Sequence, residues 1–323
     1  MMESNVVNER PSDAPPPVLG VLGGSGLYDL EGLSDVREHQ MDTPFGHPSG
    51  PLVTGHIAGA RIAFLARHGR GHRLSPSEIN YRANVHALKQ MGVERVLSIS
   101  AVGSLREGIM PGDLVLPDQL IDKTHLRAST FFGDGVVGHV SLADPVCAAL
   151  VHLVATAASE TGTAAAASDE RARPVGTRSG SGGRRLPRLH RGGAYVCMEG
   201  PQFSTRAESL LHRGWGADVI GMTAATEAKL CREAEMCFAI LALSTDYDCW
   251  RPSEEGVTAA SVIAVLRANI ARAQDVVRAA VPLTAGPRSC GCGRAAAHAI
   301  LTAPEAITPE ARERLRILYG RYL

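Results

Sequence analysis

Residues 237–243 form an uninterrupted apolar run, Cys-Phe-Ala-Ile-Leu-Ala-Leu. Such a run is typical of a strand buried on both faces, as in a parallel sheet covered by helices on both sides. The run ends in Ser-Thr-Asp-Tyr-Asp at 244–248. Because ligands bind beyond the carboxyl ends of strands in an open parallel sheet, Asp246 and Asp248 lie where a site is expected. Their spacing would turn both carboxylates to one face of an extended segment, although a helix cap explains them equally well.

Other short runs of β-forming residues alternate with helical patterns along the chain, and this alternation predicts a single α/β domain with a largely parallel sheet. The runs that we interpret as strands are 18–22, 61–66, 95–100, 113–116, 195–198, 218–222 and 237–243. Ser75-Pro76-Ser77-Glu78 has the pattern of a capping box and predicts a helix start. A second helix is predicted from about Thr258, where apolar residues recur with a spacing of three and four.

Charge and hydropathy narrow the choice of partner. The chain has 323 residues, of which 33 are basic and 33 acidic. This balance gives no overall field that would attract nucleic acid or an anionic membrane. No apolar segment is long enough to span a bilayer, and the N-terminus is acidic, polar and proline-rich, unlike a secretory signal. We therefore expect a cytoplasmic protein that binds a small molecule, not nucleic acid or a membrane.

Composition divides the chain into segments. Residues 1–17 lack apolar periodicity and are expected to form a disordered leader. The stretch 161–193 is rich in arginine and poor in large apolar residues, so we interpret it as a flexible basic insertion within a domain at 18–286. The remainder, 287–323, is a tail in which Thr308-Pro309-Glu310 opens a helix, expected to dock on the same subunit or a neighbouring one.

The seven cysteines lie mostly in apolar stretches, as expected for reduced core thiols. Cys290-Gly291-Cys292 is the exception. Its spacing offers half of a zinc site, but a complete site needs further ligands, and His298 alone is thin support. We prefer the interpretation of two ordinary thiols in a glycine-rich turn.

Small hydrogen-bond donors and an arginine follow several of the predicted strands. The groups are Gly23-Gly24-Ser25-Gly26, Arg67-His68, Ser100-Ala101 and Met222-Thr223. Backbone amides, hydroxyls and histidine can all donate to a phosphate, and arginine can do so through two parallel hydrogen bonds. The glycine run does not have the GxGxxG spacing of a dinucleotide site. Each group is a weak signal alone, but their convergence at one sheet edge predicts a single anion site.

Ordered motifs covering about Val18 to Pro282 resemble the S-methyl-5'-thioadenosine phosphorylase family, within the trimeric purine nucleoside phosphorylase superfamily. The motifs lie at 23–27, 43–46, 66–70, 80–84, 103–105, 110–113, 199–208, 215–223 and 245–250. The resemblance implies a nucleoside phosphorylase fold, with a central mixed, largely parallel twisted sheet flanked by helices. It also implies phosphorolysis of methylthioadenosine in purine and methionine salvage, no metal or organic cofactor, inorganic phosphate as co-substrate, and a homotrimer or a dimer of trimers.

The resemblance also assigns roles to residues. Asp246, Arg67 and His68 are implied to be catalytic. The implied phosphate site comprises Ser25, Arg67, His68, Ser100, Ala101 and Thr223. Met222 matches the methionine that packs on the ribose, and the base pocket matches Phe203, Ser204, Asp246 and Asp248. The pocket for the 5'-substituent, partly contributed across a subunit boundary, matches His139, Ala259, Val262 and Ile263.

Relatives that prefer 6-oxopurines carry asparagine in place of Asp246 and glutamate in place of Ser204. Both residues therefore favour adenine. Thr226 departs from the family pattern, which has proline there. Some thermophilic relatives have a CxC redox pair, which is a further interpretation of Cys290 and Cys292. The alternatives left open are a methylthioinosine or purine nucleoside phosphorylase, a hydrolytic nucleosidase, and a purine-binding protein without catalysis.

Overall fold

The computed structural model describes residues 6–7, 15–24, 31–165, 186–251 and 259–323. Within these ranges the strands form one mixed sheet of thirteen strands. The strands are β1 (Val6–Val7), β2 (Leu19–Gly23), β3 (Ser34–His39), β4 (Leu52–Ile57), β5 (Ala60–Ala66), β6 (Arg95–Ser104), β7 (Leu114–Leu116), β8 (Gln119–Asp122), β9 (Ala164–Ala165), β10 (Arg188–Arg191), β11 (Ala194–Cys197), β12 (Val219–Gly221) and β13 (Cys237–Asp246). Each of the seven runs interpreted as strands contains or overlaps one of them, which confirms the predicted α/β class.

The centre of the sheet has the order β5-β2-β6-β13, and these neighbours are parallel. Antiparallel pairs follow on both sides, β4 against β5 and β7 against β13. Nine of the ten residues of β13 are buried. The apolar run of 237–243 is therefore a central strand, as predicted.

Strand β6 links the central strands to a side branch of the sheet. Strand β6 pairs with β13 as far as Gly103, and Gly103 and Ser104 also pair with β12, antiparallel. Strand β12 pairs in turn with β11, and β11 with β8. The last residues of β6 therefore lie beside those of both β12 and β13, so loops that are distant in sequence meet at one place.

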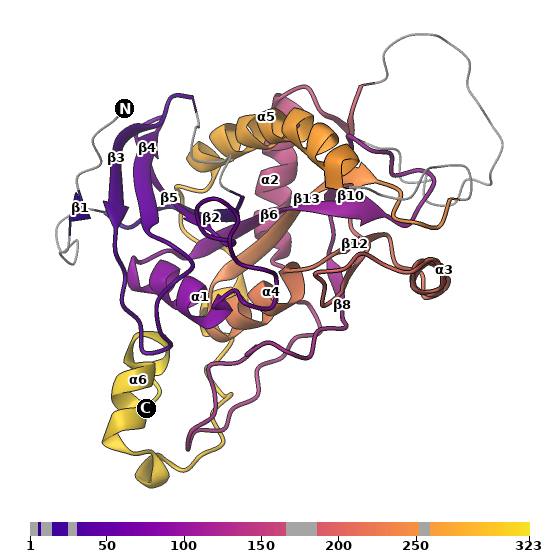
Figure 1. Cartoon of the computed structure of the whole chain (residues 1–323). Helices are drawn as coiled ribbons and strands as arrows, with labels where there is room; N and C mark the ends of the chain where they lie inside the picture. The colour runs from indigo at the N-terminus through magenta and orange to yellow at the C-terminus, as the bar shows by residue number, and fades with distance from the viewer. Residues whose placement is uncertain (1–5, 8–14, 25–30, 166–185, 252–258) are drawn as a thin grey trace.

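The helices are α1 (Tyr81–Gln90), α2 (Ala148–Glu160), α3 (Arg206–Gly214), α4 (Ala224–Glu233), α5 (Ala259–Leu283) and α6 (Pro309–Tyr319), with short 3-10 turns η3 (Gly291–Arg294) and η4 (Pro304–Ala306). Helices α2 and α5 pack together, as do α1 and α4. Figure 1 places α5 on one side of the central strands and α1 and α4 on the other, which explains why β13 is apolar on both faces. None of the helices in the described part of the chain combines the length and apolar character needed to cross a membrane.

Helix starts were predicted with mixed success. Helix α5 begins at Ala259 and α6 follows Thr308, whose side chain accepts from Ala311 N, as expected. The helix predicted from Ser75 is wrong. Ser75 N does donate to Glu78 Oε2 at 2.8 Å, but this bond closes a single turn. Helix α1 starts later, with Asn80 as its N-cap, and the same side chain donates to Phe45 O at 2.7 Å, a tertiary contact that no local pattern reveals.

The predicted basic insertion is narrower than 161–193. Residues 188–191 form β10, which pairs with β7, and Ala164–Ala165 forms β9 beside β10. His190 Nε2 lies 2.9 Å from Oδ2 of the fully buried Asp113, which holds the segment in the sheet. The rest of the insertion, 166–185, lies outside the described residues. The leader prediction is wrong for Val6–Val7, because they pair with β3.

The tail docks on the same subunit, one of the two arrangements expected. Helix α6 packs against α1, and its Leu315, Leu318 and Tyr319 are buried. The Tyr319 ring stacks on Phe132, with 4.9 Å between ring centroids. The apolar face predicted for this helix therefore extends the core of its own chain.

Buried His86 on α1 is expected to make the fold less stable in acid. Its side chain is 1% exposed, and neither ring nitrogen has a hydrogen-bond partner among the described residues. Burial lowers the pKa of His86 from 6.5 to about 4. The unfolded chain therefore binds a proton below about pH 6.5 that the folded chain resists, so stability falls as the pH drops from about 6.5 towards 4.

We expect His86→Leu to remove part of this acid sensitivity. Between pH 7 and pH 5 the free energy of unfolding should fall by about 2 kcal/mol more in the wild type than in the variant. Urea titrations at the two pH values measure the difference. His152→Leu, at an exposed position of α2, is the matched control and should behave as the wild type. An equal fall in wild type and His86→Leu would contradict the prediction.

Candidate active site

A cavity of about 670 Å³ lies at the carboxyl ends of the central strands. It brings together most residues that the sequence placed in a site: Arg67, His68, Ser100, Ala101, Phe203, Met222, Thr223, Asp246 and Asp248. Gly24, after β2, also lines the cavity, whereas Ser25 lies outside the described residues. The convergence predicted from separate strand ends is thus realised in one hollow.

Arg67 lines this cavity from the end of β5 and is almost fully buried, 2% exposed. Its Nε and Nη2 donate to the carboxylate of Glu227 at 2.6 and 3.0 Å. Nη1 donates to Ile99 O, and Nη2 also contacts Leu22 O and Ser98 Oγ. Burial alone would lower the pKa of Arg67, but the Glu227 carboxylate raises it above its ordinary value. Arg67 is therefore a permanent cation with a matched buried anion.

This arrangement corrects one expectation from the sequence. A bidentate grip on phosphate needs two parallel N–H groups of the guanidinium. Of the five N–H groups of Arg67, those on Nε and Nη2 face acceptors within the protein, and one on Nη1 faces Ile99 O. One Nη1 hydrogen is left for a ligand.

Sequence reasoning missed Glu227. It lies in the first turn of α4, four residues after Thr223, and its backbone N contacts Thr223 O. A glutamate one helical turn beyond a candidate site residue lies on the same helix face, and this spacing could have identified it.

His68 Nδ1 lies 2.8 Å from Leu74 O. Because a carbonyl only accepts, Nδ1 carries the proton of the neutral ring, and Nε2 is then an acceptor. Burial lowers the pKa of His68 to about 4, and Arg67 contributes to the lowering. At neutral pH His68 therefore offers a lone pair unless a bound anion draws a second proton onto the ring.

Asp246 and Asp248 line the cavity from the end of β13, and β2 and β6 separate this strand from β5 in the sheet. Asp246 Oδ1 accepts from Asp248 N at 2.7 Å, and its Oδ2 accepts from Thr245 Oγ1 at 2.7 Å. Asp248 has a positive φ of 52°, so the backbone is no longer extended there and the predicted strand-like alternation fails. Asp248 Oδ2 is buried and has no hydrogen-bond partner within the described structure. Asp246 thus caps its own turn while lining the cavity, and Asp248 offers an unused acceptor.

Met222 is held from two directions. Arg127 donates to Met222 O and, at 2.9 Å, to Glu199 Oε1. Gly200 has a φ of 70°, and a Cβ there would lie 2.6 Å from Met222 Sδ. Neither Arg127 nor Gly200 was singled out as a site residue from the sequence. The methionine therefore has little freedom to move.

Some predicted residues are not brought to the cavity wall. Ser204 does not line it, although Ser204 O accepts from Cys249 Sγ next to Asp248. His139 is exposed, on a segment that pairs with the tail through His139 N and Ala299 O. The other three residues predicted for the 5'-substituent pocket, Ala259, Val262 and Ile263, lie on α5, but their side chains fall outside the described part. Ile270, on the same helix, does line the cavity and was missed.

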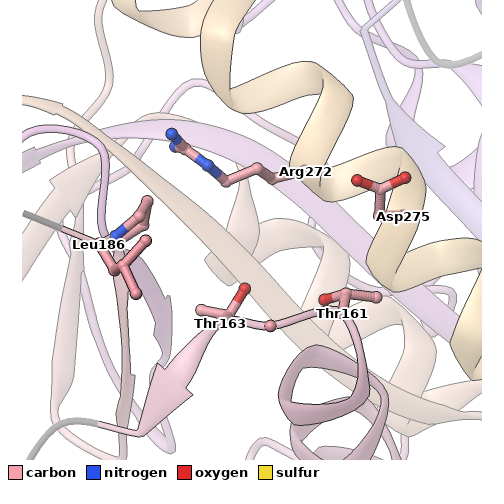
Figure 2. A pocket seen from close by; sticks show the side chains of 7 residues that line it. Thr161, Thr163, Leu186, Arg272 and Asp275 are labelled. Carbon is pink, nitrogen blue, oxygen red and sulfur yellow. The ribbon is translucent and has the colours of Figure 1, made fainter. Parts of the chain in front are cut away.

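A second cavity, of about 420 Å³, lies between α5 and the ends of the basic insertion. Figure 2 shows Arg272 and Asp275 of α5 facing Thr161, Thr163 and Leu186. Both charged groups are already engaged, Asp275 by Arg278 and Arg272 by Gly112 O and Asn269 Oδ1. None of its lining residues has a buried polar side-chain atom without a partner in the described structure, unlike Asp248 and Thr223 in the first cavity.

Comparison with known proteins identifies the family of the chain. The model of the phosphorylase superfamily matches residues 18–282. S-methyl-5'-thioadenosine phosphorylase of Geobacter sulfurreducens is 50% identical over 95% of this chain and 99% of its own length. The enzyme of the same name from Koribacter versatilis is 49% identical, over 94% and 96% of the two chains.

Solved structures give the same result. A methylthioadenosine phosphorylase from an Antarctic soil metagenomic library superimposes with a TM-score of 0.83 at 44% identity, covering 94% of this chain and 99% of that one. The Schistosoma mansoni enzyme in complex with adenine superimposes with a TM-score of 0.78 at 35% identity, covering 86% and 96%. The expected fold is therefore confirmed, and the chain belongs to the phosphorylase superfamily.

Proposed function

We propose that this protein catalyses the phosphorolysis of S-methyl-5'-thioadenosine. Inorganic phosphate attacks the anomeric carbon of the sugar, the bond to N9 of adenine breaks, and 5-methylthioribose 1-phosphate and adenine leave. The observation that carries the proposal is one cavity that Arg67 lines from the end of β5 and the Asp246–Asp248 pair lines from the end of β13. The shared name of relatives that align over nearly the full chain supports the choice of nucleoside.

Phosphate would bind beside Arg67. Because Glu227 balances the charge of Arg67, the pocket is not strongly cationic when empty, and hydrogen-bond donors matter as much as charge. Thr223 Oγ1 is buried without a partner among the described residues and supplies one donor. Ser25, Ser100 and the Ala101 amide are proposed to add further donors. His68 Nε2 would accept the proton of hydrogen phosphate, or become a donor by protonation.

The sugar would lie between Arg67 and the Asp246–Asp248 pair, on Met222. Cleavage of an N-glycosidic bond builds positive charge on the sugar and negative charge on the purine. A phosphate anion beside the sugar stabilises the first charge. Asp246, as a neutral acid or by a hydrogen bond to protonated N7, would stabilise the second. Both effects act only as the bond breaks, so they raise kcat.

Base selectivity would come from the Asp246–Asp248 pair. The unpaired Oδ2 of Asp248 can accept a hydrogen bond from the exocyclic amine of adenine. A 6-oxopurine would present an oxygen to that oxygen, and the buried acceptors would remain unpaired, which costs about 1–3 kcal/mol. Phe203 and Ser204 are proposed to complete the base pocket.

The methylthio group would lie towards α5. Ala259, Val262 and Ile263 are proposed to form its pocket because no side chain in this set can pair a buried alcohol. Ile270 lines the cavity from the same helix and adds apolar surface. His139 is proposed to reach the pocket of a neighbouring subunit.

We infer a homotrimer or a dimer of trimers, and a cytoplasmic location. Large apolar side chains around α3 support association, since Phe203 at the cavity is 49% exposed and Leu210, Leu211 and Trp215 are also exposed. The proposed reaction uses phosphate as co-substrate and needs no metal or organic cofactor.

A substrate panel with and without phosphate tests the proposal. Initial rates should be highest with methylthioadenosine, lower with adenosine, and about 10- to 100-fold lower with methylthioinosine or inosine. Removing phosphate should abolish turnover. A preference for the 6-oxopurines would instead indicate the sister phosphorylase, full activity without phosphate would indicate a hydrolase, and adenine binding without turnover would indicate a binding protein.

A further inference from the structure

Four of the seven cysteines meet at one point of the core, away from the cavity of the active site. The Sγ atoms of Cys147, Cys237, Cys290 and Cys292 all lie within 4.8 Å of one another. Three of these residues are buried and Cys290 is partly buried. No disulfide joins them, and the sulfurs of Cys237 and Cys290 are 3.3 Å apart.

Three segments that are distant in sequence supply these thiols. Cys147 precedes α2, and its backbone N donates to Phe238 O at 2.8 Å, which ties the helix start to β13. Cys237 opens β13, with its N bonded to Glu94 O at 2.9 Å. Cys290 and Cys292 flank the first residue of η3. Backbone hydrogen bonds and a short turn therefore hold these segments together at the cluster.

The spacing suits a single tetrahedral ion. A Zn²⁺ ion with zinc–sulfur bonds of about 2.3 Å places its four sulfurs about 3.8 Å apart, inside the limit observed here. A disulfide needs sulfurs at about 2.05 Å and uses only two thiols. Soft thiolate ligands in a closed, four-coordinate set are the donors of structural zinc sites.

Positive side chains surround the cluster. Arg232 Nη1 lies 3.9 Å from Cys292 Sγ. Arg288, two residues before Cys290, donates to Glu235 O at 2.9 Å and to Glu94 Oε1 at 2.7 Å, so it is fixed at the same corner of the fold. Four thiolates around one dication carry two excess negative charges, and neighbouring guanidinium groups reduce the cost of burying them.

We propose that Cys147, Cys237, Cys290 and Cys292 bind one Zn²⁺ ion in a closed structural site. Binding displaces the four thiol protons to solvent and leaves the oxidation state of sulfur unchanged. Among the interpretations left open for Cys290 and Cys292, this proposal favours the metal site, with Cys147 and Cys237 as the missing ligands in place of His298.

The ion would fasten the C-terminal segment, yellow in Figure 1, to the start of β13. Beyond η3 that segment bonds to Glu235 through Ala296 N and Tyr322 Oη. It also pairs with residues 137–139, through Leu301 N to Val137 O and His139 N to Ala299 O. Loss of the ion should therefore loosen the tail before it affects the sheet.

Metal analysis of the full-length protein tests the proposal. Wild-type protein purified under reducing conditions from zinc-supplemented cells should contain about one zinc and no iron per chain. Cobalt substitution should give the thiolate charge-transfer and intense ligand-field absorptions of tetrahedral sulfur coordination. Cys290→Ser and Cys292→Ser should retain less than about 0.2 zinc per chain. Cys231→Ser, a buried cysteine outside the cluster, is the matched control and should keep the full amount.

The cobalt spectrum of the wild-type protein tests the proposal even if the serine variants fail to fold. Wild-type protein with less than about 0.1 zinc per chain and no thiolate–cobalt absorption would overturn the proposal. So would iron in place of zinc, or mass-spectrometric mapping of disulfides within the cluster in freshly alkylated protein. Chelator treatment that lowers the melting temperature of the wild type but not of Cys290→Ser would support the fastening role.

Discussion

Asparagine in place of Asp246 is expected to lower kcat for methylthioadenosine by about 10²- to 10³-fold, because an amide cannot deliver a proton to the departing purine. The fold should survive. The amide oxygen can still accept from Asp248 N, and the amide N–H can donate to Thr245 Oγ1, whose hydroxyl also contacts Val102 O at 3.2 Å. The loss of rate would therefore report on chemistry at the base.

The same substitution should relax base selectivity. An asparagine N–H can donate to the oxygen of a 6-oxopurine, which the carboxylate cannot do. The ratio of kcat/KM for inosine to that for adenosine should rise by at least about 10-fold. Steady-state rates with both nucleosides measure it. Asp144→Asn, an exposed carboxylate, is the control. If Asp246→Asn retains both the wild-type kcat and the wild-type ratio, Asp246 does not contact the base.

Arg67→Met is expected to lower the free energy of unfolding by about 3–5 kcal/mol, a substantial part of the stability of a typical domain. The substitution leaves Glu227, 1% exposed, without its cation, and it removes the donors that face Ile99 O and Leu22 O. The double variant Arg67→Met with Glu227→Met removes both charges and should recover much of the loss. Urea unfolding of the two variants and the wild type measures these differences.

The buried pair also changes how the phosphate role of Arg67 should be tested. Truncation would mix lost binding with lost folding, whereas Arg67→Lys keeps a positive charge against Glu227 and removes the one Nη1 N–H that is left for a ligand. We expect this variant to stay folded and to raise KM for phosphate by about 10-fold. An unchanged KM for phosphate would remove Arg67 from the phosphate site. If Arg67→Met is as stable as the wild type, the ion pair with Glu227 does not stabilise the fold.

The sequence predicted the central strands well because burial on both faces leaves a continuous apolar run, as in β13. It failed for elements whose residues face water. Strand β3 is mostly exposed and is held by its pairing with β4. Strand β10 was wrongly predicted to belong to a mobile insertion, because its arginine-rich sequence gives no sign of the contact between His190 and Asp113. Pairing partners of this kind are distant in sequence and leave no local pattern.

The candidate site, too, could be predicted only in part from the sequence. By itself the sequence determined which chemical groups follow which strands, because the carboxyl ends of parallel strands share one edge of the sheet. Only the tertiary structure decided how those groups are used. Arg67 and Glu227, 160 positions apart in the sequence, form a buried ion pair. Most donors of the arginine that was predicted to bind phosphate therefore bind groups of the protein itself. Likewise, four cysteines between positions 147 and 292 lie in one cluster in the folded chain. The sequence shows which side chains are thiols, but the packing of the whole chain decides which of them lie close together.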